Sequence, residues 1–73
     1  MKVRCDITGL DCAHCATKLE KMLKNKFLDA NLNYALGTLV LDVLENADED
    51  EVVAKAQAVA NDFEDGIEIS LRD

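Results

Sequence analysis

Several residue types are scarce in this sequence, and each absence excludes a class of protein. Among the 73 residues there is no proline and no tryptophan, and aromatic residues make up only 4%. Apolar residues make up 49% and charged residues 32%, a composition typical of a globular chain, which argues against a disordered, linker-like or collagen-like segment. A chain of this length has room for one small core, so we expect a single domain over residues 1–73.

Positive charge is also scarce. Eight Lys and Arg residues stand against fifteen Asp and Glu residues, which gives a formal net charge of −7. A surface of that sign repels a phosphate backbone, so we expect no nucleic-acid partner. The charge is uneven, because residues 1–26 carry six basic and three acidic residues, whereas residues 27–73 carry two and twelve. The two parts are therefore expected to meet partners differently, unless the charges are simply solvated helix faces.

Long apolar runs are missing as well. Residues 1–10 contain no stretch of signal-peptide length, and the most apolar later segment, residues 35–44, is interrupted by Gly37 and Asp42. We therefore expect a soluble, cytoplasmic chain that makes no membrane contact of its own. Three cysteines are an odd number in a chain without an export signal, which disfavours a disulfide framework and favours reduced thiols.

The first 25 residues predict a strand followed by a helix. Residues 2–7 alternate apolar and polar side chains, the pattern of a strand buried on one side. Residues 13–25 carry apolar side chains at helical spacing, with lysines on the other side. Cys5 lies on the apolar face of the strand and Met22 on that of the helix, so both are expected to pack in the core.

The rest of the chain predicts a hairpin, a second helix and a last strand. Residues 27–34 and 38–44 both alternate and are separated by a turn glycine. Asp48, followed three residues later by Glu51, predicts a capping box at a helix start, and residues 67–71 alternate again. This order of elements, with one apolar face per strand, predicts an α+β sandwich in which two helices cover one face of a four-stranded antiparallel sheet.

The segment "GLDCAHCA", residues 9–16, places two thiols three positions apart at the predicted helix start. Cys12 precedes the helix and Cys15 lies in its first turn, where unpaired N–H groups and the helix dipole stabilise a thiolate. Two such thiolates suit a metal ion, but they also suit a dithiol that cycles to a disulfide. The intervening Ala13 and His14, in so short a chain, differ from a thioredoxin-like site, so metal binding is the favoured interpretation.

Asp11 bears on which metal would bind. A carboxylate directly before the first cysteine adds an oxygen donor and a negative charge. Asp11, Cys12 and Cys15 together would therefore suit a divalent zinc or cadmium ion, whereas copper(I) prefers two soft sulfurs and no third anion. The alternative role of Asp11 is to cap the helix that follows.

A fourth ligand is less well defined. His14 lies between the two cysteines, and we expect its side chain to point away from an ion that they share. Glu64 or Asp65, in the turn after the second helix, should lie at the same end of the sandwich and could approach the site. Water or a side chain of a partner is an equal alternative.

The segment "GLDCAHCATKLEKML", placed after a short strand, resembles the heavy-metal-associated domains, which occur as copper chaperones, in mercury-binding proteins and as N-terminal domains of metal-transporting P-type ATPases. The resemblance spans the chain and implies a ferredoxin-like fold, with strand order 4-1-3-2 and a surface metal site at the two cysteines. Aspartate before the first cysteine is typical of zinc, cadmium and lead pumps. The resemblance therefore implies Asp11, Cys12 and Cys15 as the metal ligands.

Our hypothesis from the sequence is a cytoplasmic domain that binds a divalent zinc, cadmium or lead ion and passes it on by ligand exchange. It would not itself be an enzyme. Its expected setting is the N-terminal part of a metal-exporting P-type ATPase, as a monomer, with other ATPase domains or a metal donor or acceptor as partners. The alternatives are a copper(I) chaperone or copper-ATPase domain, a dithiol oxidoreductase, and a purely structural interaction domain.

Overall fold

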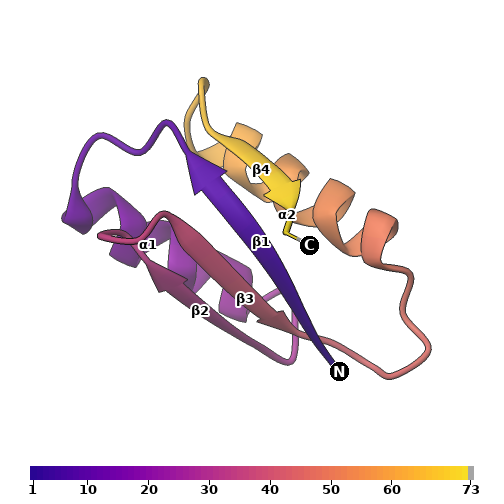
Figure 1. The fold of residues 1–73 in the computed structure, drawn as a ribbon. Helices are drawn as coiled ribbons and strands as arrows, with labels where there is room; N and C mark the ends of the chain where they lie inside the picture. Colours follow the sequence, from indigo (N-terminus) through magenta and orange to yellow (C-terminus); the bar gives the residue numbers. More distant parts are fainter. Residues whose placement is uncertain (73) are drawn as a thin grey trace.

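The computed structural model describes residues 1–72 and contains six regular elements. In chain order they are β1 (Lys2–Thr8), α1 (Ala13–Lys24), β2 (Asp29–Asn33), β3 (Thr38–Asp42), α2 (Glu49–Phe63) and β4 (Glu68–Leu71) (Figure 1). The predicted order of strands and helices is confirmed. Neither α1 nor α2 combines the length and the apolar character that a membrane-spanning helix needs.

The four strands form one antiparallel sheet in the order β2-β3-β1-β4. β1 is a central strand, with Cys5 opposite Leu39 of β3 and Ile7 opposite Ile69 of β4. Each helix links two strands that are not neighbours, and both helices lie on the same face of the sheet (Figure 1). This is the expected α+β, ferredoxin-like βαββαβ fold, with the strand order 4-1-3-2 when read from the β4 edge.

The core lies between the sheet and the two helices. Alternation in β1 buries Val3, Cys5 and Ile7, and Cys5 has no exposed surface. Met22 is partly exposed and packs against this cluster, so the expectation that both residues belong to the core is confirmed. The other buried apolar residues are Ala16, Leu19, Leu23, Ala30, Leu39, Leu41, Val43, Val52, Ala56, Val59, Ala60, Ile67 and Ile69. Full burial of a Leu or Ile side chain contributes about 1.5–3 kcal/mol.

Polar side chains of the helices bind the backbone at both edges of the sheet. At the β2 edge, Glu20 Oε2 accepts a hydrogen bond from the backbone N–H of Leu32 at 2.7 Å. At the β4 edge, Gln57 Nε2 donates to the carbonyl oxygen of Ile67, and Gln57 Oε1 accepts from the N–H of Ile69, both at 2.7 Å. Unpaired edges invite pairing with another chain, so these contacts protect β2 and β4.

The strands of the hairpin are shorter than the predicted segments 27–34 and 38–44. Leu28 and Tyr34 share the alternation but fall outside β2 and are exposed. Apolar alternation alone does not fix where a strand ends, because the ends depend on which residues pair with a neighbouring strand. These positions lie beyond the paired residues of β2 and β3.

The start of α2 also differs from the prediction in one detail. Asp48 is the N-cap as predicted, but its Oδ1 accepts from the N–H of Asp50 at 2.9 Å, not from that of Glu51. The cap therefore acts one residue earlier than the predicted capping box, and it satisfies a free N–H of the first turn in the same way.

Candidate metal centre

The two-thiol segment begins in a loop that packs against the turn between α2 and β4. Gly9 follows β1 with φ +91°, a conformation that favours glycine. A Cβ atom at Gly9 would collide with the carbonyl oxygen of Gly66 and lie 3.0 Å from the Cα atom of Ile67. The absence of a side chain at Gly9 therefore lets the two backbone segments approach closely, which fixes the loop that carries the cysteines.

Cys12 is the N-cap of α1. Its backbone is extended, with φ −161° and ψ 164°, and its Sγ atom accepts from the N–H of Cys15 at 3.4 Å. The carbonyl oxygen of Cys12 accepts from the N–H of Ala16 at 3.2 Å, which begins the helical hydrogen bonding. A thiol thus takes the place that a carboxylate or hydroxyl usually holds. The alternative interpretation of Asp11 as the helix cap is wrong, because the cap is the next residue.

The Sγ atoms of Cys12 and Cys15 lie 3.3 Å apart and share a hydrogen bond, and both cysteines are free. The backbone N–H of Cys15, and then its thiol, hold the pKa of Cys12 below its ordinary value. The hydrogen bond with Cys12 and the local burial raise the pKa of Cys15. Cys12 therefore loses its proton first, and the Cys15 thiol donates to the thiolate that remains.

The other predicted ligands are placed near this pair but are not gathered with it. Asp11, His14 and Asp65 are exposed, and Glu64 is half-buried and close enough for its negative charge to add to the raised pKa of Cys15. Within residues 1–72, no three His, Cys, Asp or Glu side chains are arranged as a metal site. The structure thus brings the two sulfurs together, and the assignment of Asp11 as a third ligand stays a prediction.

The sulfur pair can perform two kinds of chemistry. Two thiolates bound to one zinc ion at about 2.3 Å lie roughly 3.8 Å apart, so a small side-chain rotation would open the pair to hold an ion. The separation of 3.3 Å between thiols, one of them with a lowered pKa, also suits formation of a disulfide. Cys12 is exposed and Cys15 half-buried, so an ion at the pair would remain within reach of an incoming ligand.

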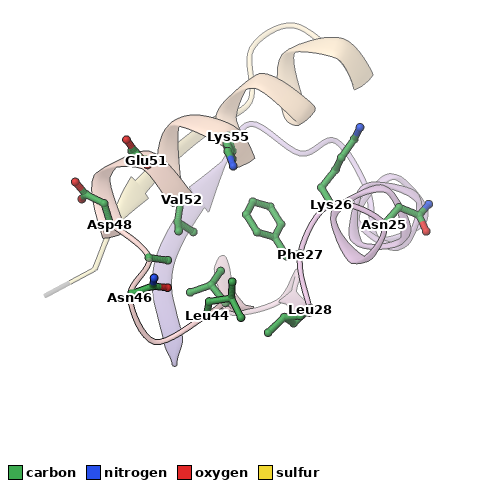
Figure 2. A pocket seen from close by; sticks show the side chains of 12 residues that line it. Asn25, Lys26, Phe27, Leu28, Leu44, Asn46, Asp48, Glu51, Val52 and Lys55 are labelled. Atoms are coloured by element: carbon green, nitrogen blue, oxygen red, sulfur yellow. The ribbon is translucent and has the colours of Figure 1, made fainter.

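One groove lies at the other end of α1, away from the cysteines. Its volume is about 440 Å³, and it lies between the residues that follow α1 and those that begin α2. Figure 2 shows Phe27, Leu44 and Val52 among the side chains that line it, together with Lys26 and Lys55. It holds neither Cys12 nor Cys15 and is not part of the candidate metal centre.

The fold is shared with solved metal-binding domains. A copper-binding domain from HMA7, a P-type ATPase, is similar with a TM-score of 0.74 and 19% identity over 99% of this chain and 93% of that one. The N-terminal domain of a potential copper-translocating P-type ATPase from Bacillus subtilis, solved in its Cu(I)-loaded state, has a TM-score of 0.66 and 28% identity over 96% of this chain and 84% of that one. The fold of this chain is that of a heavy-metal-associated domain.

A larger structure gives the setting in which such a domain occurs. The water-soluble region of the P-type ATPase CopA from Bacillus subtilis is similar with a TM-score of 0.66 and 27% identity, and the match covers 97% of this chain but 45% of that one. No family model matches the sequence, and no curated protein matches it.

The comparisons support some of the predictions from the sequence and not others. The expected fold is confirmed, and the neighbours, which are metal-binding domains, support the resemblance to heavy-metal-associated domains. The expected preference for zinc, cadmium or lead receives no support, because the neighbours named above from HMA7 and from the potential copper-translocating ATPase are described as copper proteins. The copper(I) alternative fits these neighbours.

Proposed function

We propose that this domain binds a thiophilic metal ion between Cys12 and Cys15 and passes it on by ligand exchange. One observation carries the proposal: two thiols stand 3.3 Å apart at an accessible helix start, and the pKa of Cys12 is lowered. Metal ions bind thiolates, so a group that loses its proton readily lowers the competition between proton and metal.

The exposure of the pair supports transfer rather than permanent storage. A structural zinc site is closed by four protein ligands, whereas only two sulfurs meet here. A thiolate from a partner can bond to the ion before either Cys12 or Cys15 lets go, so the ion is never left without ligands. Tight binding and rapid transfer are then compatible, because the exchange needs no unfolding of the domain.

Copper(I) is the first candidate ion. Two soft thiolates without a third donor are the ligands that copper(I) prefers, and two sulfurs lie close together at this site. The similar N-terminal domain from Bacillus subtilis was solved in its Cu(I)-loaded state, which supports the same choice of ion here.

A divalent zinc or cadmium ion is the second candidate, and Asp11 is the observation that favours it. Its carboxylate is exposed and directly precedes Cys12, so it could turn to a bound ion without disturbing the core. Carboxylate oxygen together with two thiolates suits a borderline divalent ion. Water, Glu64 or Asp65 would then complete the coordination.

A competition titration with chelators of known affinity separates the two candidates. We expect Cys12→Ser to abolish binding of either ion. A copper(I) carrier retains its copper affinity in Asp11→Ala, whereas a divalent carrier loses zinc or cadmium affinity by about tenfold or more. Glu45→Ala, which removes an exposed charge outside the site, is the matched control and should change neither affinity. Unchanged metal binding in Cys12→Ser would contradict the proposal.

Redox chemistry is the rival role for the same sulfurs. Their separation of 3.3 Å and the lowered pKa of Cys12 also suit an oxidoreductase, which would cycle between dithiol and disulfide. Catalysed reduction of insulin disulfides at a rate above that of free dithiothreitol, lost in Cys12→Ser, would favour that role. We expect no such acceleration.

The setting follows from the size of the similar proteins. Because the match covers less than half of the CopA water-soluble region, we propose that this domain works beside other domains of a metal-transporting P-type ATPase on its cytoplasmic side, as a monomer. Its exposed thiol pair would exchange the ion with those domains or with a soluble donor or acceptor. Light scattering with and without metal tests the monomer, which should persist in both states.

A further inference from the structure

Asp65 and Gly66 form the exposed turn between α2 and β4, which packs against Gly9 in the loop that carries the cysteines. This is the only place in the sequence where an aspartate or an asparagine precedes a glycine. A glycine in that position lets its backbone nitrogen approach the carboxyl carbon of the aspartate, because no β-carbon obstructs the approach. The space around Gly66 is open as well, since a Cβ atom there would meet nothing within 4 Å.

The backbone N–H of Gly66 is not occupied by a backbone hydrogen bond. Among residues 1–72 it has no backbone acceptor. Asn46, which precedes the small residue Ala47, is the contrasting case, because the N–H of Ala47 donates to the carbonyl oxygen of Leu44 at 3.0 Å. A nitrogen held in this way must first lose its hydrogen bond before it can react. Gly66 therefore presents the more reactive backbone nitrogen.

We propose that Asp65 is a site of spontaneous isomerisation to isoaspartate, and that this modification displaces the loop that carries the cysteines. The nitrogen of Gly66 attacks the side-chain carboxyl carbon of Asp65, an N–C bond forms, a C–O bond breaks, and the amide proton and the hydroxyl group leave as water. The product is a cyclic succinimide.

Water then opens the succinimide ring at one of its two carbonyl carbons. Opening at the former side-chain carbon restores aspartate, whereas opening at the former backbone carbon gives isoaspartate, in which the main chain runs through the side chain. One water molecule is released and one is consumed, so no oxidant or reductant takes part. The modification itself needs no metal ion, and only its effect on metal affinity rests on the proposed function.

Isoaspartate adds one carbon atom to the backbone of a turn that is fixed on both sides. Before the turn, the N–H of Glu64 donates to the carbonyl oxygen of Ala60 at 2.9 Å and ends α2. After it, Gly66 lies so close to Gly9 that a Cβ atom at Gly9 would collide with the carbonyl oxygen of Gly66. The added atom must displace one of these two contacts. We therefore expect a less stable domain and a weaker metal site.

The test stores the reduced, metal-free protein in neutral buffer and locates isoaspartate by mass spectrometry with electron-transfer fragmentation, which distinguishes the two isomers although their masses are equal. We expect isoaspartate at Asp65 before any other Asp or Asn residue. Asp65→Glu keeps the charge but would have to form a larger ring, so it should show no isomer at this position over the same time. Asp62→Glu, an exposed change near the same end of α2, is the matched control and should isomerise at Asp65 like the wild type.

The consequence is measured on the isomerised molecules after chromatographic separation from the unmodified ones. We expect them to bind copper(I) and cadmium(II) about threefold or more weakly, and to unfold at a lower urea concentration. Stored Asp65→Glu should keep both properties. Absence of isoaspartate at Asp65, or its formation there no sooner than at Asn46, overturns the inference.

Two further outcomes separate this inference from the proposed function. Isomerised molecules with the metal affinity and the urea midpoint of the unmodified protein would overturn the displacement of the loop. A fresh wild-type domain that binds neither ion would overturn the proposed function alone, because isoaspartate at Asp65 together with a lowered urea midpoint would still support the modification and its effect on the fold.

Discussion

The backbone N–H of Cys15 lies 3.4 Å from the Sγ atom of Cys12, and this single contact makes Cys12 both the cap of α1 and the more acidic thiol of the pair. The helix start and the chemistry of the site are thus the same structural feature. Because a thiolate accepts the N–H better than a thiol does, ionisation of Cys12 also strengthens the cap.

The first prediction concerns the order in which the three cysteines react. At neutral pH the lowered pKa of Cys12 gives it the largest thiolate fraction, Cys15 has a raised pKa, and Cys5 is fully buried. Iodoacetamide should therefore modify Cys12 first, then Cys15, and Cys5 only on unfolding. Mass spectrometry of peptides from the reduced, metal-free protein measures this order. Modification of Cys15 ahead of Cys12 would contradict the described hydrogen bonding.

The second prediction concerns folding without metal. The core cluster contains neither Cys12 nor Cys15, so the metal-free domain should unfold cooperatively. Serine is a good N-cap, so Cys12→Ser should retain α1 and shift the urea midpoint little, with a change of about 0.5 kcal/mol or less. Circular dichroism during urea unfolding measures this. A non-cooperative transition in the metal-free wild type would indicate a structural metal site rather than a transfer site.

The third prediction concerns stability at alkaline pH. Burial, followed by the charges of Asp6 and Glu49, raises the pKa of Cys5 from 9.0 to about 11. Between these values the unfolded chain loses the Cys5 proton while the folded domain keeps it, so the free energy of unfolding falls as pH rises from 9 to 11. Below pH 9 this contribution is fully retained.

The variant Cys5→Ala isolates this effect from the other groups that titrate at high pH. It should be less stable than the wild type at about pH 8, because a buried side chain is lost, but its free energy of unfolding should fall less steeply up to about pH 11. Urea unfolding across that range gives both curves. Parallel curves would mean that Cys5 ionises equally in both states.

The fourth prediction compares the two glycines that join the metal loop to the turn between α2 and β4. Both have positive φ, +91° at Gly9 and +95° at Gly66, but a Cβ atom collides only at Gly9 and meets nothing within 4 Å at Gly66. Gly66→Ala should cost about 1–2 kcal/mol of stability from backbone strain alone. Gly9→Ala should cost about 1–3 kcal/mol more, because the backbones must separate.

Metal affinity provides the second measurement for this pair of variants. Gly9→Ala displaces the loop that carries Cys12 and should weaken metal binding, whereas Gly66→Ala should leave it close to wild type. Equal destabilisation of the two variants, with equal metal affinity, would show that the close approach of the two backbones does not position the site.

The fifth prediction concerns the edge of the sheet. Gln57 makes two hydrogen bonds of 2.7 Å to the backbone of Ile67 and Ile69, and a third, of 2.9 Å, to Asn61 Oδ1. Gln57→Ala leaves these edge groups without partners and should lower the free energy of unfolding by about 1–3 kcal/mol. Asn61→Ala removes only the exposed bond and serves as the control. Similar losses in both variants would contradict the role of Gln57 at the edge.

Sequence periodicity predicted β1, α1 and α2 well, because the side chains that each of these elements buries lie on one face of it. The alternation of Val3, Cys5 and Ile7 and the helical spacing in α1 and α2 depend on local geometry, so they can be seen in the sequence. The ends of β2 were predicted less well, because the exposure of Leu28 and Tyr34 depends on tertiary packing beyond the paired residues. The capping contact of Cys12 was not predicted, since thiols are uncommon caps.

The sequence by itself determined the order of the elements, the burial of Cys5 and the pair of cysteines at a helix start, because these follow from residue spacing within one strand or one helix. Only the tertiary structure decided that Gly66 meets Gly9 and that Gln57 binds the β4 edge. These contacts join segments far apart in the chain, and their geometry is set by how the helices pack on the sheet. The reason is physical: periodicity records which side of an element is buried, but not which neighbour covers it.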